Sequence, residues 1–291
     1  MAPRVVKASA GLLAYRHLFH AGNFADVFKH ALLARLLVAL GKKDKPCCYV
    51  DTHAGLGVYD LSHAWSVKNA EFRSGIGRLW GHDDAPALLA PYLDAVRAEN
   101  RGKELRYYPG SPRIAQRLLH PSDRLVLSEL NKADCAALAE RCAADRRVTV
   151  HLMDGYQSLK AHLPPPERRG LVLVDSSFDR AGEFKRLADA LAAAHQRWAT
   201  GIYALWYPMM ASTAMRAFER NVVATGIRKV LQLELAVRPE GWALGMHGCG
   251  MLVVNPPFGF DDEAQTILAW LWRALAVNSD GGQRVRWLVP E

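Results

Sequence analysis

Five short apolar runs alternate with longer stretches that suit helices, and this alternation constrains the fold more than any other feature of the chain. Residues 133–144 and 184–198 are two of the helix-compatible stretches. Strands that alternate with helices form βαβ units around a mostly parallel sheet, so we predict an α/β fold. The predicted strands are residues 47–50, 125–127, 148–150, 171–174 and 202–206.

Signals near both ends of the chain extend this prediction. Asn23 is a suitable N-cap for a helix that begins at Phe24, and Gly41 stands where many helices end on a left-handed residue. Residues 230–237 and 251–254 have no helical pattern between them. They predict an antiparallel hairpin at one sheet edge, and residues 284–289 predict a final strand or extended tail.

One connection is far longer than a single crossover helix requires. The 67 residues from 58 to 124 separate the first predicted strand from the second. Apolar residues at helical spacing lie in the first part of this segment. We therefore expect an inserted helical subdomain at residues 58–110, with residues 1–57 and 111–291 forming the main domain.

Composition excludes several classes of protein and favours one kind of partner. Half of the residues are hydrophobic and 23% are charged, which is ordinary for a folded globule and excludes a disordered or collagen-like chain. Lys and Arg number 37 against 29 Asp and Glu, a net charge of +8, and the pI is near 9.3. Such a charge is typical of nucleic-acid binding, although it also serves solubility.

The five cysteines and the N-terminal segment indicate the compartment. The cysteines are odd in number and form no CxxC pair, so we expect them to be reduced and structural. Residues 1–10 lack the apolar core and cleavage site of a signal peptide, and no apolar stretch reaches the roughly 20 residues that cross a bilayer. We expect a cytoplasmic protein that is not inserted in a membrane.

A glycine-containing turn follows the first predicted strand. Its sequence runs from Asp51 through His53 and Gly55 to Gly57. Glycine allows backbone N–H groups to approach a ligand at the carboxyl edge of an open α/β sheet. A tight turn explains the glycines equally well, and the incomplete GxGxxG pattern argues against a nicotinamide-dependent oxidoreductase.

Acidic residues also follow the next three predicted strands. Glu129 is placed to accept hydrogen bonds from two ribose hydroxyls, and Asp154, followed by Gly155, can meet an adenine amino group. Asp175 follows the fourth strand. A single such acid is more often a helix N-cap. Four in order, counting Asp51, are the arrangement found in S-adenosylmethionine-dependent methyltransferases.

A set of motifs extends over nearly the whole chain from residue 14, and the opening dozen residues look like an extension. The motifs are residues 15–30, 44–46, 51–55, 106–112, 169–171, 203–208, 224–229 and 255–257. Together they resemble the RlmJ family of bacterial 23S rRNA adenine-N6 methyltransferases.

This resemblance implies a Rossmann-like class I methyltransferase fold with an inserted helical subdomain. It implies an enzyme that transfers a methyl group from S-adenosylmethionine to adenine N6 of 23S ribosomal RNA. Asp175 would be the catalytic acid, Phe178 would hold the base, and Tyr15 would contact the RNA. The implied cofactor contacts are His30, His53, Ser111, Glu129, Asp154, Gly155 and Asp175.

The loop after the fourth strand departs from the family pattern. The expected Asp-Pro-Pro-Tyr is replaced by Asp175, Ser176, Ser177 and Phe178. Two prolines would fix the backbone φ angles, so this loop is expected to be less preorganised and catalysis slower. The literal Asn-Pro-Pro-Phe at residues 255–258 follows a late strand, and we judge it the weaker candidate for the catalytic loop.

Three alternatives remain open at this point. The first is a non-enzymatic RNA-binding or ribosome-assembly protein with a degenerate Asp175 loop. The second is the oxidoreductase. The third, a metal site at His17, His20 and His30, lacks a fourth ligand at suitable spacing, so we expect no metal. A monomer is the expected assembly.

Overall fold

An eight-stranded mixed sheet forms the centre of the computed structural model, which describes residues 16–210, 213–240, 242, 245–277 and 279–291. The strand order is β10-β8-β9-β7-β6-β1-β4-β5. Strands β7, β6, β1, β4 and β5 are parallel, whereas β9, β8 and β10 join by antiparallel pairing. The strands are β1 Cys48–Asp51, β4 Arg124–Glu129, β5 Val148–Leu152, β6 Gly170–Val174, β7 Ile202–Met209, β8 Val230–Ala236, β9 Gly248–Val254 and β10 Gly282–Val289.

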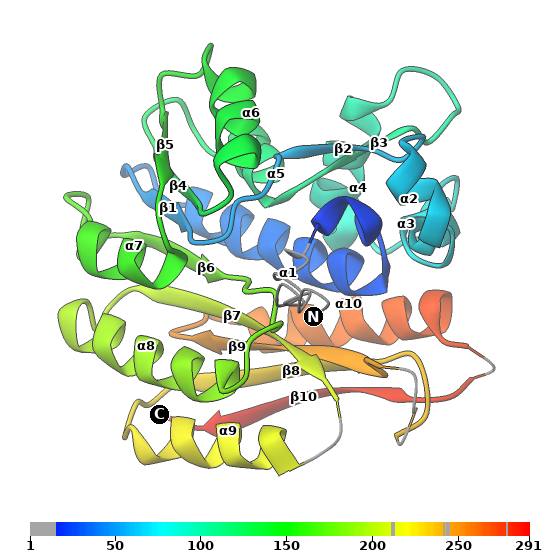
Figure 1. Ribbon diagram of the computed structural model, residues 1–291. Helices are drawn as coiled ribbons and strands as arrows, with labels where there is room; N and C mark the ends of the chain where they lie inside the picture. The colour runs from blue at the N-terminus through cyan, green and yellow to red at the C-terminus, as the bar shows by residue number, and fades with distance from the viewer. Residues whose placement is uncertain (1–15, 211–212, 241, 243–244, 278) are drawn as a thin grey trace, which may run out of the picture.

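Helices cover both faces of the sheet, which gives three layers (Figure 1). One hydrophobic cluster joins the sheet to α1, α5, α6 and α10, and a second joins the other face to α7, α8 and α9. This two-sided cover explains why the parallel strands have continuous apolar sequences. The helices are α1 Phe24–Gly41, α5 Ser111–Leu118, α6 Lys132–Cys142, α7 Gly155–His162, α8 Glu183–Arg197, α9 Thr213–Ala224 and α10 Phe260–Leu275.

The central strand β1 shows how the sequence specifies both layers. Tyr49 packs into the cluster with α1, while its neighbours Cys48 and Val50 pack into the cluster with α7 and α8. All three are fully buried, because alternate side chains of a strand point to opposite faces. All five cysteines of the chain are free and buried, in agreement with the structural role predicted for them.

Helix α1 begins as predicted but ends differently. The Asn23 side chain accepts hydrogen bonds from the backbone N–H groups of Ala25 and Asp26, both at 3.0 Å. The prediction of a left-handed Gly41 is wrong: Gly41 is the last helical residue, and Lys42 follows with φ −63°. The Lys42 N–H bonds to the Ala39 carbonyl, so a tightened last turn ends the helix without a left-handed residue.

The long connection after β1 contains helices and also a small antiparallel pair that the sequence did not predict. β2 pairs with β3, and the Gly110 N–H donates to the Gly57 carbonyl at 2.8 Å, so the segment begins and ends side by side. Strands of three residues are too short to produce a recognisable period. The domain boundaries at 57 and 110 stay a prediction. The elements are β2 Val58–Asp60, α2 Ala64–Asn69, η2 Glu71–Ser74, α3 Ile76–Leu79, η3 Ala87–Leu89, α4 Ala90–Glu99 and β3 Tyr107–Pro109.

The C-terminal strands agree with the predicted hairpin. β8 and β9 pair antiparallel, with Leu231 opposite Val253, and β10 adds to the outer edge of β8. β9 also pairs antiparallel with β7, so it joins the hairpin to the parallel part of the sheet. Within the described part of the chain, no helix has both the length and the apolar character to span a membrane.

Candidate active site

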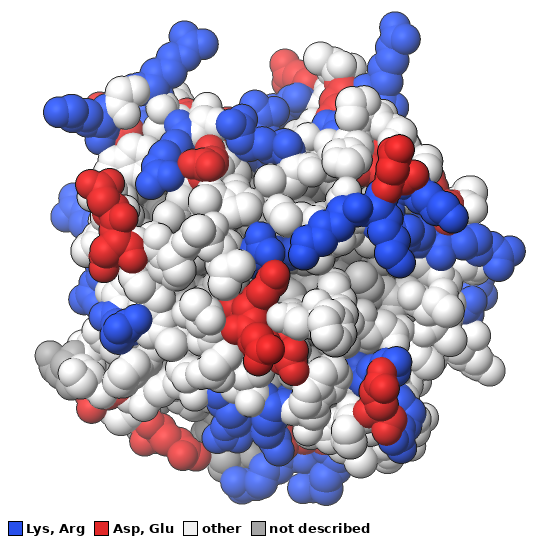
Figure 2. All heavy atoms as spheres, turned by 180° about the vertical axis from the view of Figure 1, so that it is seen from behind, with Lys and Arg blue, Asp and Glu red and all other residues white. Residues whose placement is uncertain are grey.

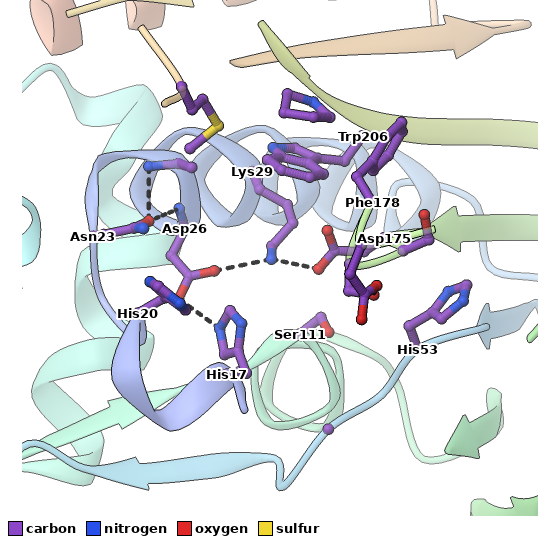
Figure 3. A pocket seen from close by; sticks show the side chains of 18 of the residues that line it. His17, His20, Asn23, Asp26, Lys29, His53, Ser111, Asp175, Phe178 and Trp206 are labelled. Carbon is purple, nitrogen blue, oxygen red and sulfur yellow. Dashed lines mark hydrogen bonds and ion pairs between the residues drawn. The ribbon is translucent and has the colours of Figure 1, made fainter. Parts of the chain in front are cut away.

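A cavity of about 930 Å³ opens at the carboxyl ends of the parallel strands (Figure 3). Its lining includes every described residue that the resemblance implies for the cofactor or the target base. Tyr15 lies outside the described residues, so its position is not assessed. The eight predicted residues on the lining are His30, His53, Ser111, Glu129, Asp154, Gly155, Asp175 and Phe178.

Strand register brings these distant residues together. Asp51 at the end of β1 lies opposite Leu127 of β4 and Leu173 of β6. Glu129 and Asp175 therefore follow at the same edge, where open α/β sheets bind their ligands. Three of the four predicted strand-end acids, Glu129, Asp154 and Asp175, therefore line the same cavity.

Asp51 itself is an exception among the four strand-end acids. Its side chain is fully buried and does not line the cavity. The Tyr49 hydroxyl donates to its carboxylate at 2.7 Å. Burial raises the pKa of Asp51 to about 6, opposed by hydrogen bonds from Ser111 and Tyr49. Asp51 therefore supports the turn from within rather than contacting a ligand.

Glu129 is held by the glycine turn and retains capacity for a ligand. The Gly55 N–H donates to one carboxylate oxygen at 2.9 Å, and the Asn131 N–H donates to the other at 2.7 Å. A carboxylate has about four acceptor sites, so two remain, enough for the two hydroxyls of a ribose. Gly55 has φ +60°, which favours glycine at this position.

Asp154 combines a capping role with a position on the cavity wall. One of its oxygens accepts from the N–H groups of Tyr156 and Gln157 at the start of α7, and the other pairs with Arg186 at 2.8 Å. Burial opposes ionisation, but Arg186 outweighs it and lowers the pKa of Asp154. The carboxylate is therefore ionised and fixed in place.

Gly155 allows the wall to come close to the turn after β1. A Cβ atom at this position would lie 2.3 Å from the Thr52 carbonyl oxygen and 2.7 Å from Cε1 of His53. Only glycine allows such an approach without a backbone shift. A nucleoside cofactor fits this part of the cavity. Its adenine can lie against the close approach at Gly155 beside the neighbouring acids, and its ribose hydroxyls can donate hydrogen bonds to Glu129.

Lys29, which the sequence analysis did not single out, is at the centre of the site. Its ammonium group pairs with Asp26 at 2.9 Å and also contacts Asp175 (Figure 3). Burial opposes the charge, but Asp175 and Asp26 outweigh it and raise the pKa of Lys29 well above its usual range. The lysine therefore stays charged and holds the Asp175 carboxylate in one position.

A sequence signal for Lys29 did exist. Asp26, Lys29 and His30 are at i, i+3 and i+4 of helix α1, so they share one face. An unpaired charge is costly to bury, so a buried acid and a buried base on one helix must pair with each other or with a third charged group. That third partner, Asp175, is 146 residues away in sequence, and only the fold brings it near.

The histidines near this helix have separate partners. His17 bonds to Asp26 at 2.9 Å, His20 to Glu71 at 3.0 Å, and His30 to the Tyr108 hydroxyl at 2.8 Å. Their ring nitrogens are thus not directed at a common point. No group of three or more potential metal ligands occurs among the residues that the structure describes.

Two buried histidines of the cavity are kept neutral. Burial lowers the pKa of His30 well below its usual value, and the nearby Lys29 charge acts in the same direction. Burial also lowers the pKa of His53, against the attraction of Asp175. Neutral imidazoles can donate to or accept from a ligand without adding positive charge beside a cationic methyl donor.

Aromatic rings form the wall beyond Asp175. Phe178 has φ +53°, and its ring lies 5.9 Å from that of Trp206 and 4.8 Å from that of Phe184. The Lys29 ammonium lies 6.0 Å from the centre of the Trp206 ring. Trp206 is thus a second site residue that the sequence analysis did not single out. Its position in strand β7 made it resemble a core residue.

The Asn-Pro-Pro-Phe segment lies at the opposite edge of the sheet. β9 is antiparallel to β7, so Val254 at its end is opposite Tyr203 near the beginning of β7. The Asn255 side chain donates to the carbonyls of Ala199 and Gly201, and Phe258 is fully exposed. This segment cannot take part in the cavity, which supports the preference for the Asp175 loop.

One face of the molecule shows how its Lys and Arg side chains are distributed. On the face opposite the view of Figure 1, Lys and Arg side chains form several separate groups, and acidic side chains gather between them (Figure 2). This face therefore offers no continuous basic track, and specific contacts to an RNA are better sought around the cavity mouth.

The fold and the site together define a class of protein. A Rossmann-like sheet, a glycine turn after β1 and acids after β4, β5 and β6 that meet in one cavity are the features of a class I S-adenosylmethionine-dependent methyltransferase. The predicted fold class is therefore confirmed, and the incomplete glycine fingerprint remains an argument against the oxidoreductase.

Comparisons with known proteins agree with this class. The family model described as "Ribosomal RNA large subunit methyltransferase D, RlmJ" matches residues 44–289. Ribosomal RNA large subunit methyltransferase J of Escherichia coli (strain K12) is 44% identical over 280 residues, 96% of this chain and all of the relative. Its namesake in Haemophilus influenzae is 43% identical over 281 residues, again 96% of this chain and all of the relative.

A solved structure has a closely similar fold. A protein from Legionella pneumophila superposes with a TM-score of 0.83 at 36% identity, covering 92% of this chain and 97% of that one. The chain belongs to the RlmJ family of ribosomal RNA large subunit methyltransferases. It is an S-adenosylmethionine-dependent enzyme, as the sequence analysis predicted.

Proposed function

We propose that this protein methylates N6 of an adenine in the 23S ribosomal RNA, acting as a monomer in the cytoplasm. The observation that carries the proposal is the position of Asp175. This carboxylate lies after β6 in the same cavity as the acids suited to a nucleoside cofactor, beside the aromatic wall of Phe178 and Trp206. Family membership supports RNA as the substrate.

The cofactor would be held by residues from β4, α1, α5, the start of α7 and the turn after β1. Glu129 would accept from the ribose hydroxyls, Asp154 would meet the adenine amino group, and Gly155 would leave room for the ring. His30, His53 and Ser111 would complete the wall. When bound, S-adenosylmethionine supplies an electrophilic methyl group on a sulfonium.

Asp175 would activate the acceptor nitrogen. The N6 lone pair of adenine is delocalised into the ring, so the free amine is a weak nucleophile. The Asp175 carboxylate and the Ser176 carbonyl would accept hydrogen bonds from the two N–H groups of the adenine amine. These bonds would localise the lone pair on N6 and direct it toward the methyl group. Positioning of this kind supplies on the order of 7–11 kcal/mol of barrier reduction. Lys29 would hold the carboxylate in its orientation through their ion pair.

Phe178 would hold the target base outside the RNA stack. Enzymes that modify a base unstack it into a pocket and hold it between aromatic or apolar side chains. The left-handed conformation of Phe178 directs its ring toward Phe184 and Trp206, which brace it. Tyr15 is proposed, on the family resemblance alone, to contact the RNA from the N-terminal side.

A second candidate function rests on the serines of the Asp175 loop. A chain that binds RNA and assists ribosome assembly without transferring a methyl group is consistent with the replacement of both prolines by Ser176 and Ser177. Lys29 still holds Asp175 in the cavity, and this favours the catalytic function.

Mass spectrometry of 23S rRNA fragments distinguishes the two. We expect N6-methyladenine at one position in the wild-type strain, its loss after deletion of the gene, and its return on complementation. Unchanged RNA together with tight S-adenosylmethionine binding by the purified protein would support the assembly function. Thermal-shift measurements with S-adenosylmethionine and with NAD(P)H test the oxidoreductase, which requires stabilisation by the nicotinamide.

A further inference from the structure

The cavity has a second arm, which the proposed cofactor contacts do not line. Five of its lining residues come from the end of β7 and from the connection between β8 and β9, and none of these five carries a carboxylate. We name them the loop arm. They are Pro208, Met210, Arg238, Trp242 and Met246.

The loop arm presents apolar side chains to solvent at the cavity mouth. Trp242 is 39% exposed and Met210 is 38% exposed. Tryptophans are enriched where proteins bind other molecules, and this one lies at the mouth of the cavity. The guanidinium of Arg238 lies 5.1 Å from the centre of the Trp242 ring. One aromatic face and one positive charge are thus presented together.

The connection that carries Trp242 is tied to the sheet. The Trp242 N–H donates to the Pro239 carbonyl at 3.2 Å, which closes a turn. At the base of the loop, the N–H groups of Val237 and Arg238 both donate to the His247 carbonyl, and the His247 N–H donates to the Met209 carbonyl at the end of β7. The base of the loop therefore has a fixed relation to the strand that carries Trp206.

Distance along β7 indicates which part of a substrate would reach the loop arm. Trp206 lines the cavity next to Phe178, and Met210 follows four positions later, directly after the end of β7, about 13 Å away at the usual rise per residue of a strand. A base held beside Asp175 and Phe178 does not extend that far. The loop arm is placed for the neighbouring nucleotide of the same strand.

We propose that Trp242 stacks on the base of a nucleotide that flanks the target adenine, with Arg238 supporting the ring and contacting a phosphate. The proposal rests on the proposed function in taking RNA as the ligand. Single-stranded RNA is recognised by aromatic rings that stack on bases and by Arg or Lys on the backbone. The loop arm combines both, and Glu240, which lies between Arg238 and Trp242 in the sequence, does not line the cavity.

The test measures RNA affinity and methyl transfer separately in the full-length protein. The variants are Trp242→Ala, Trp242→Phe and Arg238→Ala. Trp287→Ala and Arg117→Ala are matched controls: Trp287 is 41% exposed on β10, Arg117 is exposed on α5, and neither lines the cavity. Fluorescence anisotropy gives Kd for a labelled single-stranded RNA oligonucleotide, and deproteinised 23S rRNA from a deletion strain gives kcat and KM.

We expect Trp242→Ala to raise Kd and KM for RNA by about 5- to 20-fold, toward the lower end of stacking effects because the ring is partly exposed. The kcat and the Kd for S-adenosylmethionine should not change, and Trp242→Phe should restore most of the affinity. Arg238→Ala should reduce the slope of log Kd against log salt by about 0.7, the value for one phosphate contact on a single strand. Both controls should behave as wild type.

Two results would overturn the proposal. The first is an equal KM for RNA in Trp242→Ala and Trp287→Ala. The second is a lower Tm for Trp242→Ala with unchanged RNA affinity, which would mean that the contact between Trp242 and Arg238 only stabilises the loop. If the wild type methylates RNA while Trp242→Ala is unaffected, the stacking role fails and the proposed function stands. If RNA affinity depends on Trp242 but no methyl is transferred, the proposed function fails instead.

Discussion

Substitution of Lys29 by methionine tests whether this lysine compensates the buried acids of the site. The ammonium group is 5% exposed and pairs with Asp26, which is 2% exposed, and with Asp175, which is 16% exposed. Methionine keeps most of the volume and removes the charge. Two carboxylates would then share a largely buried space without their common cation.

The expected loss follows from this burial. Removal of one partner from a buried ion pair costs about 3–5 kcal/mol, because the remaining charge is left uncompensated. His17 still contacts Asp26, so we expect the lower half of that range. The matched control is Lys185→Met: Lys185 pairs with Asp189 at the surface, where both side chains are more than 60% exposed. An exposed pair of this kind contributes about 0.3–0.5 kcal/mol.

The pKa shifts of Asp26 and Lys29 determine how their contribution to stability changes with pH. The pKa of Asp26 is lowered in the folded protein: burial acts against this shift, and His17 and Lys29 outweigh it. Its contribution to stability is therefore present above the unfolded pKa and is lost as the pH falls through the folded pKa. The pKa of Lys29 is raised, so its contribution is present below the unfolded pKa and is lost as the pH rises through the folded value. The wild-type network thus contributes fully near neutral pH.

Urea denaturation of both variants at pH 7 and at about pH 5 measures the effect. Without the lysine the acids can bind protons more readily, so the loss in Lys29→Met should shrink at the lower pH. The Asp26→Asn/Lys29→Met double variant should recover part of the loss. A change below about 1 kcal/mol, or the same loss at both pH values, would refute the compensating role.

Three further predictions concern the turn after β1 and the Asp175 loop. Asp51→Asn should remove a decrease in wild-type stability of about 3 kcal/mol between pH 4 and pH 7: a pKa raised to about 6 favours folding below the unfolded pKa, and this contribution is lost as the pH rises through 6. Gly155→Ala should cost about 1–3 kcal/mol and weaken S-adenosylmethionine binding in calorimetry, because its Cβ would meet the Thr52 carbonyl at 2.3 Å. Ser176→Pro/Ser177→Pro should raise kcat and Tm, since each proline lowers the ordering cost by about 0.4–1 kcal/mol; a slower, less stable variant would mean that the serine backbone does not suit proline.

The sheet was largely predictable because its parallel strands are buried on both faces. Such strands appear as continuous apolar runs, as in β6, where Gly170 to Val174 are all buried. The pair of β2 and β3 was not predictable, because three residues carry no period. The end of α1 was mispredicted because Gly41 does not need its conformational freedom there.

The site was predictable where it depends on strand ends. Acids that follow parallel strands must meet at one edge, so Glu129, Asp154 and Asp175 could be inferred from spacing alone. The spacing of Asp26 and Lys29 on one helix face indicates that the lysine needs a partner, but it does not identify Asp175 as that partner. Trp206 could not be inferred, because its strand resembles a core strand. Their partners are defined by the tertiary fold and not by local sequence.

Methyl transfer by Asp175 variants shows whether this carboxylate takes part in the reaction. Purified wild type, Asp175→Asn, Asp175→Ala and Asn255→Ala would be assayed at saturating S-adenosylmethionine on deproteinised 23S rRNA, with cofactor affinity measured separately. The account predicts a fall in kcat of about 10²–10³ for both Asp175 variants and wild-type rates for Asn255→Ala. Full activity in Asp175→Ala would contradict it, above all if Asn255→Ala were inactive.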